Sequence, residues 1–546
     1  MPTVRAITYD LLRTWGLTTV FGNPGSNELP FLDGFPADFR YVLGLHEGAV
    51  LATADGYAQA TGRPALVNLH SAAGLGNAMG NLANAHASRT PLVVTAGQQA
   101  RAMIGLGSVL AEPAMTRVPE PHVKWSFEPA RAQDVPRALS EAFHLATLAP
   151  AGPVFVSLPM DDWAAEVAEH EVAHLAGRRV RSVGAAGPEV VAELAGRLER
   201  AASPALVVGP EVDDERAYDR VVALAERLGL PVWVAPTPPR CPFPTRHPLF
   251  RGVLPPSIAG VAERLSGHDL VLVLGAPVFR YHAYRPGPWL AEGTELVAVG
   301  SDPYAAARAA FGDALVGDVA AVTGQLLEAL GPEPERRPAG EAPGAGERAG
   351  ADVRTAAGAD PARAVAPFTA DQVFALMART LPAGVRLVNE STSNTTQFWH
   401  HLELDRPRGL FFPAAGGLGF GLPAAAGVAL ADPSRPVVAV LGDGAVQYGV
   451  AGLWTAVREN LPVTFVVMRN GTYGALRGFV DQLGVENAPG LDLPGLDAVR
   501  TAQGYGLPAR RITDGAELAA ELAAVAPGRG PRLLELPLVH ETRPLG

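Results

Sequence analysis

Two polar residues, Asp443 and Asn470, carry the strongest chemical signal in the sequence. Asp443 stands in Gly442-Asp443-Gly444 directly after the apolar run 436–441, and Asn470 follows the strand-like run 463–468. Because ligands bind beyond the carboxyl ends of parallel strands, both side chains are predicted at one crevice. One carboxylate, one carboxamide and a backbone carbonyl could hold Mg²⁺, with phosphate oxygens completing an octahedral shell. Gly442-Asp443-Gly444 alone, or Asn470-Gly471 alone, is typical of a turn, but together, after two buried strands, they favour a site for Mg²⁺ and phosphate.

A second group of candidates lies in the front half of the chain. Glu47 precedes an apolar, Gly- and Ala-rich helical stretch. It is therefore either a first-turn acid favoured by the helix dipole or a buried acid that can exchange a proton. His70 and His282 lie near the ends of strand-like runs, where a lone histidine is more often structural. From the residues alone, these roles stay open.

The elements that must position these residues are short β-rich runs that alternate with Ala- and Leu-rich helical patterns. The runs are bounded by Gly and Pro and lack polar alternation, which is typical of parallel strands covered on both faces. Examples are residues 65–69, 92–96, 154–158, 205–208 and 270–274. The predicted fold class is therefore α/β, with doubly wound parallel sheets.

Composition shifts along the chain predict three domains. Residues 331–366 are almost wholly Pro, Gly, Ala, Glu and Arg, and too few of them can be buried to offset the entropy of ordering. We expect a flexible linker there, and a further boundary where the strand pattern lapses near 161–184. The predicted domains are 1–180, 181–330 and 367–546.

The first and third predicted domains also echo each other. A Gly turn, a helix and a strand recur in the same order at residues 72–97 and 414–442. This indicates either two copies of one fold or a chance likeness between Ala- and Gly-rich helices.

Composition excludes several classes of protein. The 546 residues carry 44 basic and 55 acidic side chains, a net charge of −11 that is spread along the chain. No basic face recommends a nucleic acid or a membrane surface as partner. The sole lysine, Lys124, follows no glycine, which excludes a Walker loop, and a pyridoxal Schiff base would rest on it alone. The sole cysteine, Cys241, can form neither an internal disulfide nor a cysteine zinc cluster.

The start of the chain and its apolar runs bear on location. Asp10 interrupts the first residues, so the apolar core of a signal peptide is missing there. Nowhere is an apolar run long enough to predict a membrane span. We therefore expect a cytoplasmic protein.

One loop imitates a dinucleotide fingerprint. Gly74, Gly76 and Gly80 follow a strand-like run and open a helix. The next strand ends in Gln98 and Gln99, which offer neither an acid for a ribose hydroxyl nor an arginine for a 2′-phosphate. Dinucleotide binding is therefore not expected.

Together these motifs resemble the thiamine diphosphate-dependent enzymes and, among them, the benzoylformate decarboxylase family. Residues 442–470 are similar to the metal and diphosphate motif of these enzymes, and Glu47 matches their activating glutamate. Longer similarities lie at 21–32, 68–74, 95–104, 240–248, 275–282 and 389–393. The resemblance covers nearly the whole chain outside the linker and implies three doubly wound domains of the decarboxylase type: pyrimidine, middle and pyrophosphate.

The resemblance also implies a reaction. It is the non-oxidative decarboxylation of a benzoylformate-like aromatic 2-oxo acid to an aldehyde and carbon dioxide, through a thiamine ylide and enamine. Such a carboxy-lyase would serve mandelate metabolism. Glu47 would activate the cofactor, while Ser26, His70 and His282 would bind the substrate carboxylate and transfer protons. The apolar substrate pocket is expected from Val109, Leu110, Phe412, Ala475, Gly478 and Phe479.

The cofactor residues follow from the same resemblance. Mg²⁺, with Ca²⁺ as an alternative, is expected on Asp443, Asn470 and the carbonyl of Thr472. Leu418 would bend thiamine diphosphate, and Gly416 would accept a hydrogen bond from its aminopyrimidine. Further cofactor contacts are expected from Asn23, Pro24, Gly25, Thr392, Ser393, Gly442, Gly444, Ala445, Tyr448, Tyr473 and Gly474. Because these enzymes form each site between two subunits, a homodimer or a dimer of dimers (a homotetramer) is implied.

Three positions depart from the family pattern. Arg469 replaces an asparagine next to the expected metal ligand Asn470. Gly478 stands where tryptophan is expected, which could open one side of the pocket, and Pro413 replaces a small residue beside Phe412.

Two alternatives therefore stay open. A larger pocket would suit a carboligase of the acetolactate synthase or aldehyde lyase kind, which traps the enamine with a second aldehyde. The other alternative is a cofactor-binding protein without turnover, although a binding module has no need of all four catalytic candidates together.

Overall fold

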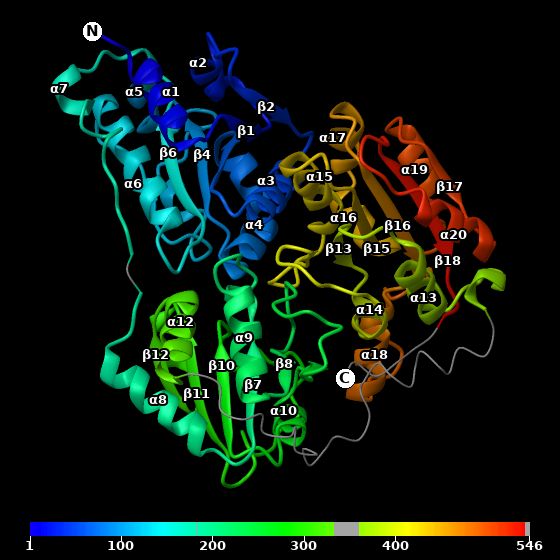
Figure 1. Cartoon of the computed structure of the whole chain (residues 1–546). Helices are drawn as coiled ribbons and strands as arrows, with labels where there is room; N and C mark the ends of the chain where they lie inside the picture. Colours follow the sequence, from blue (N-terminus) through cyan, green and yellow to red (C-terminus); the bar gives the residue numbers. More distant parts are fainter. Residues whose placement is uncertain (183, 332–359, 541–546) are drawn as a thin grey trace.

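Three six-stranded sheets organise the chain, and every pairing between their strands is parallel. The structure is a computed structural model that describes residues 1–182, 184–331 and 360–540. In Figure 1 the first domain (blue to cyan) lies beside the third (yellow to red), and the middle domain (green) lies below them. The predicted α/β class with parallel sheets is confirmed.

The first sheet has the strand order β2-β1-β3-β4-β6-β5. Its strands are β1 (Thr19–Gly22), β2 (Arg40–Leu43), β3 (Ala65–Leu69), β4 (Leu92–Gln98), β5 (Ser126–Phe127) and β6 (Val154–Pro159). The helices of this domain are α1 (Val4–Trp15), α2 (Leu29–Leu32), α3 (Glu47–Thr61), α4 (Ser71–Ala87), α5 (Arg101–Ile104), α6 (Val135–Thr147) and α7 (Glu169–Val172).

The middle sheet has the order β12-β11-β10-β7-β8-β9. Its strands are β7 (Pro204–Val208), β8 (Val232–Val234), β9 (Phe250–Val253), β10 (Leu270–Leu274), β11 (Glu295–Gly300) and β12 (Asp313–Val316). Its helices are α8 (Pro188–Arg200), α9 (Tyr218–Leu228), α10 (Ile258–Arg264), α11 (Pro303–Arg308) and α12 (Val319–Ala329).

The third sheet has the order β14-β13-β15-β16-β18-β17. Its strands are β13 (Arg386–Glu390), β14 (Leu410–Phe411), β15 (Val437–Gly442), β16 (Val463–Arg469), β17 (Ala509–Arg511) and β18 (Arg532–Pro537). Its helices are α13 (Ala370–Thr380), α14 (Thr395–His401), α15 (Gly421–Ala431), α16 (Asp443–Gly449), α17 (Gly452–Arg458), α18 (Gly474–Leu483), α19 (Ala498–Gly504) and α20 (Gly515–Ala523).

The first and third sheets share one topology. Numbered within its own domain, each has its second strand at one edge, followed by the first, third, fourth, sixth and fifth. The two domains are therefore copies of one fold. The echo between residues 72–97 and 414–442, however, pairs α4 and β4, the fourth strand of its domain, with α15 and β15, the third strand of its domain, so it does not join equivalent elements and is a chance likeness. The middle sheet is wound in a different order.

Each sheet is covered on both faces, as continuous apolar strands predict. In β15, Val437, Ala439 and Leu441 belong to one core cluster, while Val438 and Val440 belong to another. In β10 the alternate residues divide between two clusters in the same way. The strands are thus central layers that hold their carboxyl ends in fixed positions.

Helices α3 and α15 join the first domain to the third (Figure 1). A Cβ on Gly56 would lie 2.3 Å from the carbonyl oxygen of Ala424, and one on Gly427 would lie 1.9 Å from that of Thr53. The two helices therefore approach at backbone distance, which glycine alone permits here. One core cluster runs through both domains, so α3, with Glu47 at its start, is held firmly against the third domain.

The predicted linker, 331–366, lies from 332 to 359 outside the described residues. Residues 361–366 pack against the third domain: Pro361 is buried, and the Ala366 N–H donates to the Thr513 carbonyl at 2.8 Å. The boundaries 1–180, 181–330 and 367–546 stay predictions. Among the described residues, no helix combines the length and the hydrophobicity that spanning a membrane requires.

Candidate active site

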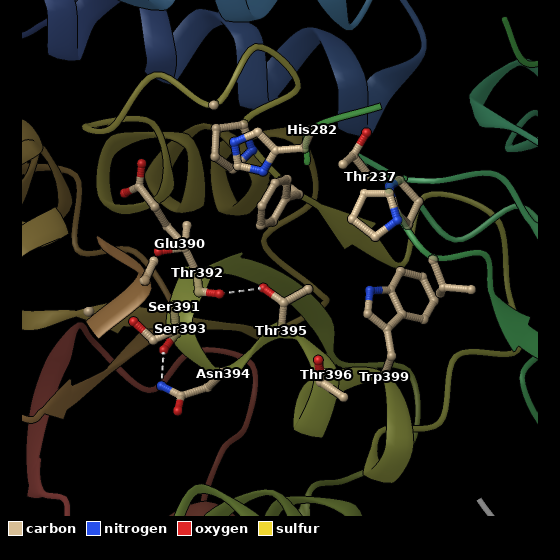
Figure 2. Close-up of a pocket in the computed structure, with 18 of the residues that line it drawn as sticks. Thr237, His282, Glu390, Ser391, Thr392, Ser393, Asn394, Thr395, Thr396 and Trp399 are labelled. Carbon is tan, nitrogen blue, oxygen red and sulfur yellow. Dashed lines mark hydrogen bonds between the residues drawn. The ribbon is translucent and has the colours of Figure 1, made fainter. Parts of the chain in front are cut away.

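A cavity of about 1040 Å³ opens at the carboxyl edge of the third sheet, between the third and middle domains. Figure 2 shows the turn 391–396 on one side and Thr237 and His282 of the middle domain across from it. Every third-domain residue predicted to contact the cofactor lines this cavity: Thr392, Ser393, Gly416, Leu418, Gly442, Asp443, Gly444, Ala445, Tyr448, Asn470, Thr472, Tyr473 and Gly474. His282, Phe412, Ala475 and Phe479 also line it.

The predicted metal ligands meet at one corner of the cavity. Asp443 begins α16 directly after β15, and Asn470 follows β16, its neighbour in the sheet. The N–H groups of Gly444 and Gly471 donate to the two Asp443 carboxylate oxygens at 2.9 and 2.8 Å. Burial raises the pKa of Asp443, while these N–H groups and the nearby Arg469 charge lower it. The corner therefore holds an oriented, partly desolvated carboxylate.

The candidate metal ligands at this corner are oxygen atoms of different chemical groups. The described residues contain no cluster of three or more His, Cys, Asp and Glu side chains that could bind a metal. A metal site here would consequently combine the Asp443 carboxylate with the Asn470 carboxamide and the Thr472 carbonyl. Such a set fits a hard divalent cation such as Mg²⁺ or Ca²⁺ better than zinc.

The turn after β13 forms the opposite lip of the cavity. The Asn394 side chain donates to Ser391 Oγ at 2.7 Å, and Thr395 Oγ1 donates to the Thr392 carbonyl at 3.1 Å (Figure 2). The start of α18 lies directly against this turn, since a Cβ added to Gly474 would lie 2.8 Å from Ser393 Oγ. The start of α18 and Ser393 thus line the same part of the cavity, and the N-terminus of a helix suits a phosphate group.

His282 and Phe479 form a contact between the middle and third domains at the cavity. Their ring centroids lie 4.9 Å apart in an edge-on arrangement. Phe479 belongs to α18, so this contact spans the two domains. The arrangement sets an imidazole beside an aromatic wall.

Glu47 stands in a separate polar group, in the first domain. It is the first residue of α3 and only 7 % exposed, so it is at once a first-turn acid and a buried one, and its exchange of a proton stays a prediction. Asn23 Nδ2 donates to its Oε1 at 3.1 Å, and Asn77 Nδ2 donates to its Oε2 at 3.0 Å. A Cβ on Gly74 would lie 2.9 Å from Oε1, so a larger residue there would displace the carboxylate. The carboxylate is held by neutral donors.

His70 lies in the same group, against the buried Glu28. The His70 Nδ1 and Glu28 Oε2 atoms are 2.8 Å apart, and the N–H groups of Gly25 and Gly97 also donate to Glu28, each at 2.8 Å. Because the Glu28 carboxylate accepts, Nδ1 carries the proton and Nε2 is left to exchange one. Ser26 is exposed in the adjoining turn.

Within one chain the two groups of predicted residues stay apart. The first-domain residues Asn23, Pro24, Gly25, Ser26, Glu47 and His70 do not line the described cavity, and neither do Val109, Leu110 and Gly478. Val109 is 83 % exposed, whereas Gly478 is buried within α18. The expectation that Gly478 opens the pocket therefore finds no support in the geometry of a single chain.

Sequence reasoning missed several polar residues that orient the candidates. Glu28 and Asn77 are the partners of His70 and Glu47, and Glu390, Asn84 and Arg280 contact the loop that carries Leu418. The sequence gives Glu28 a weak signal, because this residue lies three positions after Gly25, in a turn that follows a strand. The others lie in ordinary helices and strands and carry no local motif.

Comparison with known proteins identifies three successive family regions. Residues 2–118 match the model described as thiamine pyrophosphate enzyme, N-terminal TPP binding domain. Residues 191–327 match the thiamine pyrophosphate enzyme central domain, and residues 390–536 match the C-terminal TPP binding domain. These matches follow the order of the three sheets.

Individual relatives match over nearly the full length. The chain is 52 % identical over 537 residues to a benzoylformate decarboxylase of Pseudomonas aeruginosa, covering 98 % of this chain and 99 % of that protein. It is 28 % identical to the acetolactate synthase isozyme 3 large subunit of Escherichia coli, covering 93 % and 89 %. The solved 4-hydroxybenzoylformate decarboxylase of Rhodococcus jostii RHA1 superposes with a TM-score of 0.92 at 47 % identity, covering 99 % and 100 %.

Proposed function

Because this chain belongs to the thiamine pyrophosphate enzyme family, we propose that it decarboxylates an aromatic 2-oxo acid of the benzoylformate kind to the aldehyde and carbon dioxide. The observation that carries this proposal is the 52 % identity, over 98 % of the chain, to a benzoylformate decarboxylase. The acetolactate synthase relative is more distant, at 28 % identity, so carboligation is not proposed as the main activity.

The residues of the cavity fit thiamine diphosphate and a divalent cation. Asp443, Asn470 and the Thr472 carbonyl would hold Mg²⁺, or Ca²⁺ in its stead, and the start of α18 with Ser393 would hold the diphosphate. Support comes from the oxygen-only donors at this corner and from Gly474, which leaves room that a Cβ would fill. When bound, thiamine diphosphate supplies a nucleophilic carbon and a sink for the electron pair released with carbon dioxide.

The protein's own groups would bind the substrate and move protons. Glu47, held by two carboxamides, would exchange a proton with the aminopyrimidine through a carboxylate oxygen. His70 would transfer protons at Nε2, since its Nδ1 faces Glu28, and Ser26 would bind the substrate carboxylate. His282 stands at the aromatic end, where Phe412 and Phe479 would exclude water from an aryl ring.

The aryl preference predicts a selective substrate profile. With Mg²⁺ and thiamine diphosphate, benzoylformate should be decarboxylated at least about tenfold more efficiently than pyruvate, because the aromatic walls favour an aryl ring over a methyl group. Carbon dioxide release and the aldehyde product measure this directly. Release from none of a panel of aryl and alkyl 2-oxo acids would refute the decarboxylase proposal, and a hydroxyketone as main product would favour the carboligase.

We propose that the active unit is at least a homodimer, arranged as a dimer of dimers, in which one chain supplies Glu47 and its partner supplies Asp443. The support is the separation of the two polar groups within one chain. Large apolar side chains of the first domain are also exposed, with Leu45 at 48 %, Leu106 at 78 % and Val109 at 83 %. A partner would cover them.

Shared sites predict complementation between two inactive chains. Coexpressed E47Q and D443A chains should recover about a quarter of wild-type activity, because half of randomly formed dimers are mixed and each has one intact site of two. Each variant expressed alone should be inactive. Activity no higher than that of the single variants, in a preparation shown by mass to contain mixed dimers, would mean that each site is built from one chain.

We also propose a cytoplasmic location and a role in mandelate breakdown. The support for the first is Cys241, which is buried and free of any disulfide. The second follows from the aryl 2-oxo acid proposed as substrate.

A further inference from the structure

The loop between β14 and α15 forms one wall of the cavity and carries Gly416 and Leu418. Gly416 and Gly419 have φ values of +77° and +94°, and Gly417 lies between them. A segment so rich in glycine loses much entropy when it is ordered, so its shape needs external support. Polar groups from outside the loop contact it at both ends.

Glu390, the last residue of β13, contacts the far end of the loop. Its Oε1 accepts from the N–H groups of Gly419 and Phe420 at 2.9 and 3.1 Å, and its Oε2 accepts from Gly421 at 3.0 Å. Because α15 begins at Gly421, these N–H groups have no partner within the helix. A Cβ on Gly421 would lie 2.7 Å from the Glu390 Cβ, so glycine permits this approach.

Burial of the charged Glu390 carboxylate lowers the stability of the folded chain. It is 1 % exposed, and burial raises its pKa to about 7 despite the three N–H donors. Among the described residues, no cationic side chain lies within ion-pair distance of it. A neutral cap would satisfy free helix N–H groups without a buried charge. This cost points to a role beyond helix capping.

Asn84 contacts the near end of the loop, from α4 of the first domain. Its Oδ1 accepts from the N–H groups of Ala415 and Gly417 at 3.1 and 3.3 Å, and its Nδ2 donates to the Gly417 carbonyl at 2.8 Å. A Cβ on Gly417 would lie 3.2 Å from Nδ2. One buried carboxamide thus fixes both polar groups of the backbone at Gly417.

We propose that Glu390 and Asn84 are positioning residues that fix Leu418 from its two sides, so that the cofactor meets a wall whose shape is already set. The proposal rests on the proposed function and on the family resemblance, which implies that Leu418 contacts thiamine diphosphate. A ligand that is bound in a bent conformation exerts a force on the residue that bends it. A glycine-rich loop without support would move under this force. Hydrogen bonds on both sides of Leu418 prevent this, one set from within the domain and one from its neighbour.

The test compares E390Q with E535Q in the full-length chain. Glu535 is also a buried glutamate of the third sheet that accepts from the first N–H of a helix, at Ala498, but it lies outside the cavity. E390Q should accelerate hydrogen exchange at the amides of 419–421, and E535Q should leave those amides unchanged. N84A should accelerate exchange at 415–417, and it tests the same support should E390Q fail to fold.

Measurements of ligand binding distinguish a positioning role of Glu390 from a general loss of structure in the variant. In the presence of Mg²⁺, E390Q should weaken thiamine diphosphate binding about tenfold, the cost of ordering roughly one further residue, yet leave inorganic diphosphate affinity unchanged. The kcat should fall about tenfold to a hundredfold while KM stays near the wild-type value. Equal loss of both ligands, unaltered exchange in the loop, or the same losses in E535Q would overturn the proposal. Exchange and binding do not require turnover, so an inactive wild type would refute only the proposed function.

Discussion

Replacement of Glu47 by glutamine should lower carbon dioxide release about a thousandfold, while the chain still folds and still binds thiamine diphosphate. The carboxylate is buried at the start of α3, and both of its oxygens accept from carboxamides. Glutamine has the same size but cannot exchange a proton at this position. Asn23 or Asn77 can rotate its amide to accept from the new NH₂ group, so the folding cost should be about 1 kcal/mol.

Asp55→Asn is the matched control for this variant. Asp55 lies further along α3 and is fully buried. It accepts hydrogen bonds from Thr90 and Gln59, neither of which contacts Glu47 through a hydrogen bond. D55N should lower the melting temperature with little change in kcat. E47Q should lower kcat with little change in the melting temperature. Steady-state rates measure kcat, titration with thiamine diphosphate measures cofactor affinity, and thermal unfolding measures the melting temperature. Wild-type turnover by E47Q would disprove the proposed role of Glu47.

Much of the architecture could be predicted because parallel strands have a simple signature. Apolar runs bounded by Gly and Pro marked β3, β4, β6, β7 and β10, and the residues after such runs lie at one sheet edge. This rule brought Asp443 and Asn470 together correctly, since β15 and β16 are neighbours in register. It applies equally to the first domain, where Glu47 and His70 both follow strands.

The partners of these residues could not be predicted, for a physical reason. Hydrogen bonds such as Glu28 to His70 and Asn84 to Gly417 join residues from different elements, and they leave no periodic pattern in the sequence. Their positions follow from how whole helices pack, as at Gly56 and Ala424. The separation of the Glu47 group from the cavity likewise depends on tertiary geometry, which strand and helix patterns do not contain.

Removal of the metal corner should abolish cofactor binding and not merely slow the reaction. Asp443→Ala should weaken thiamine diphosphate binding by at least about a hundredfold, because the carboxylate is the one charged group among the proposed ligands. The N–H groups of Gly444 and Gly471 would also lose their shared acceptor, so the 470–472 turn should loosen. Treatment of the wild-type chain with a chelator should cause the same loss of binding, and added Mg²⁺ should reverse it.

The control for D443A is Asp514→Ala in the same domain. Asp514 precedes α20 and its Oδ1 accepts from the Glu517 N–H at 3.0 Å, so its loss should cost about 1 kcal/mol of stability without any change in cofactor affinity. Calorimetric titration of thiamine diphosphate, with and without Mg²⁺, distinguishes the two variants. Because D443A removes a ligand and not the metal supply, excess Mg²⁺ should rescue the chelated wild type far more completely than the variant. Metal-independent binding in the wild type, or full rescue of D443A, would contradict a metal site at this corner.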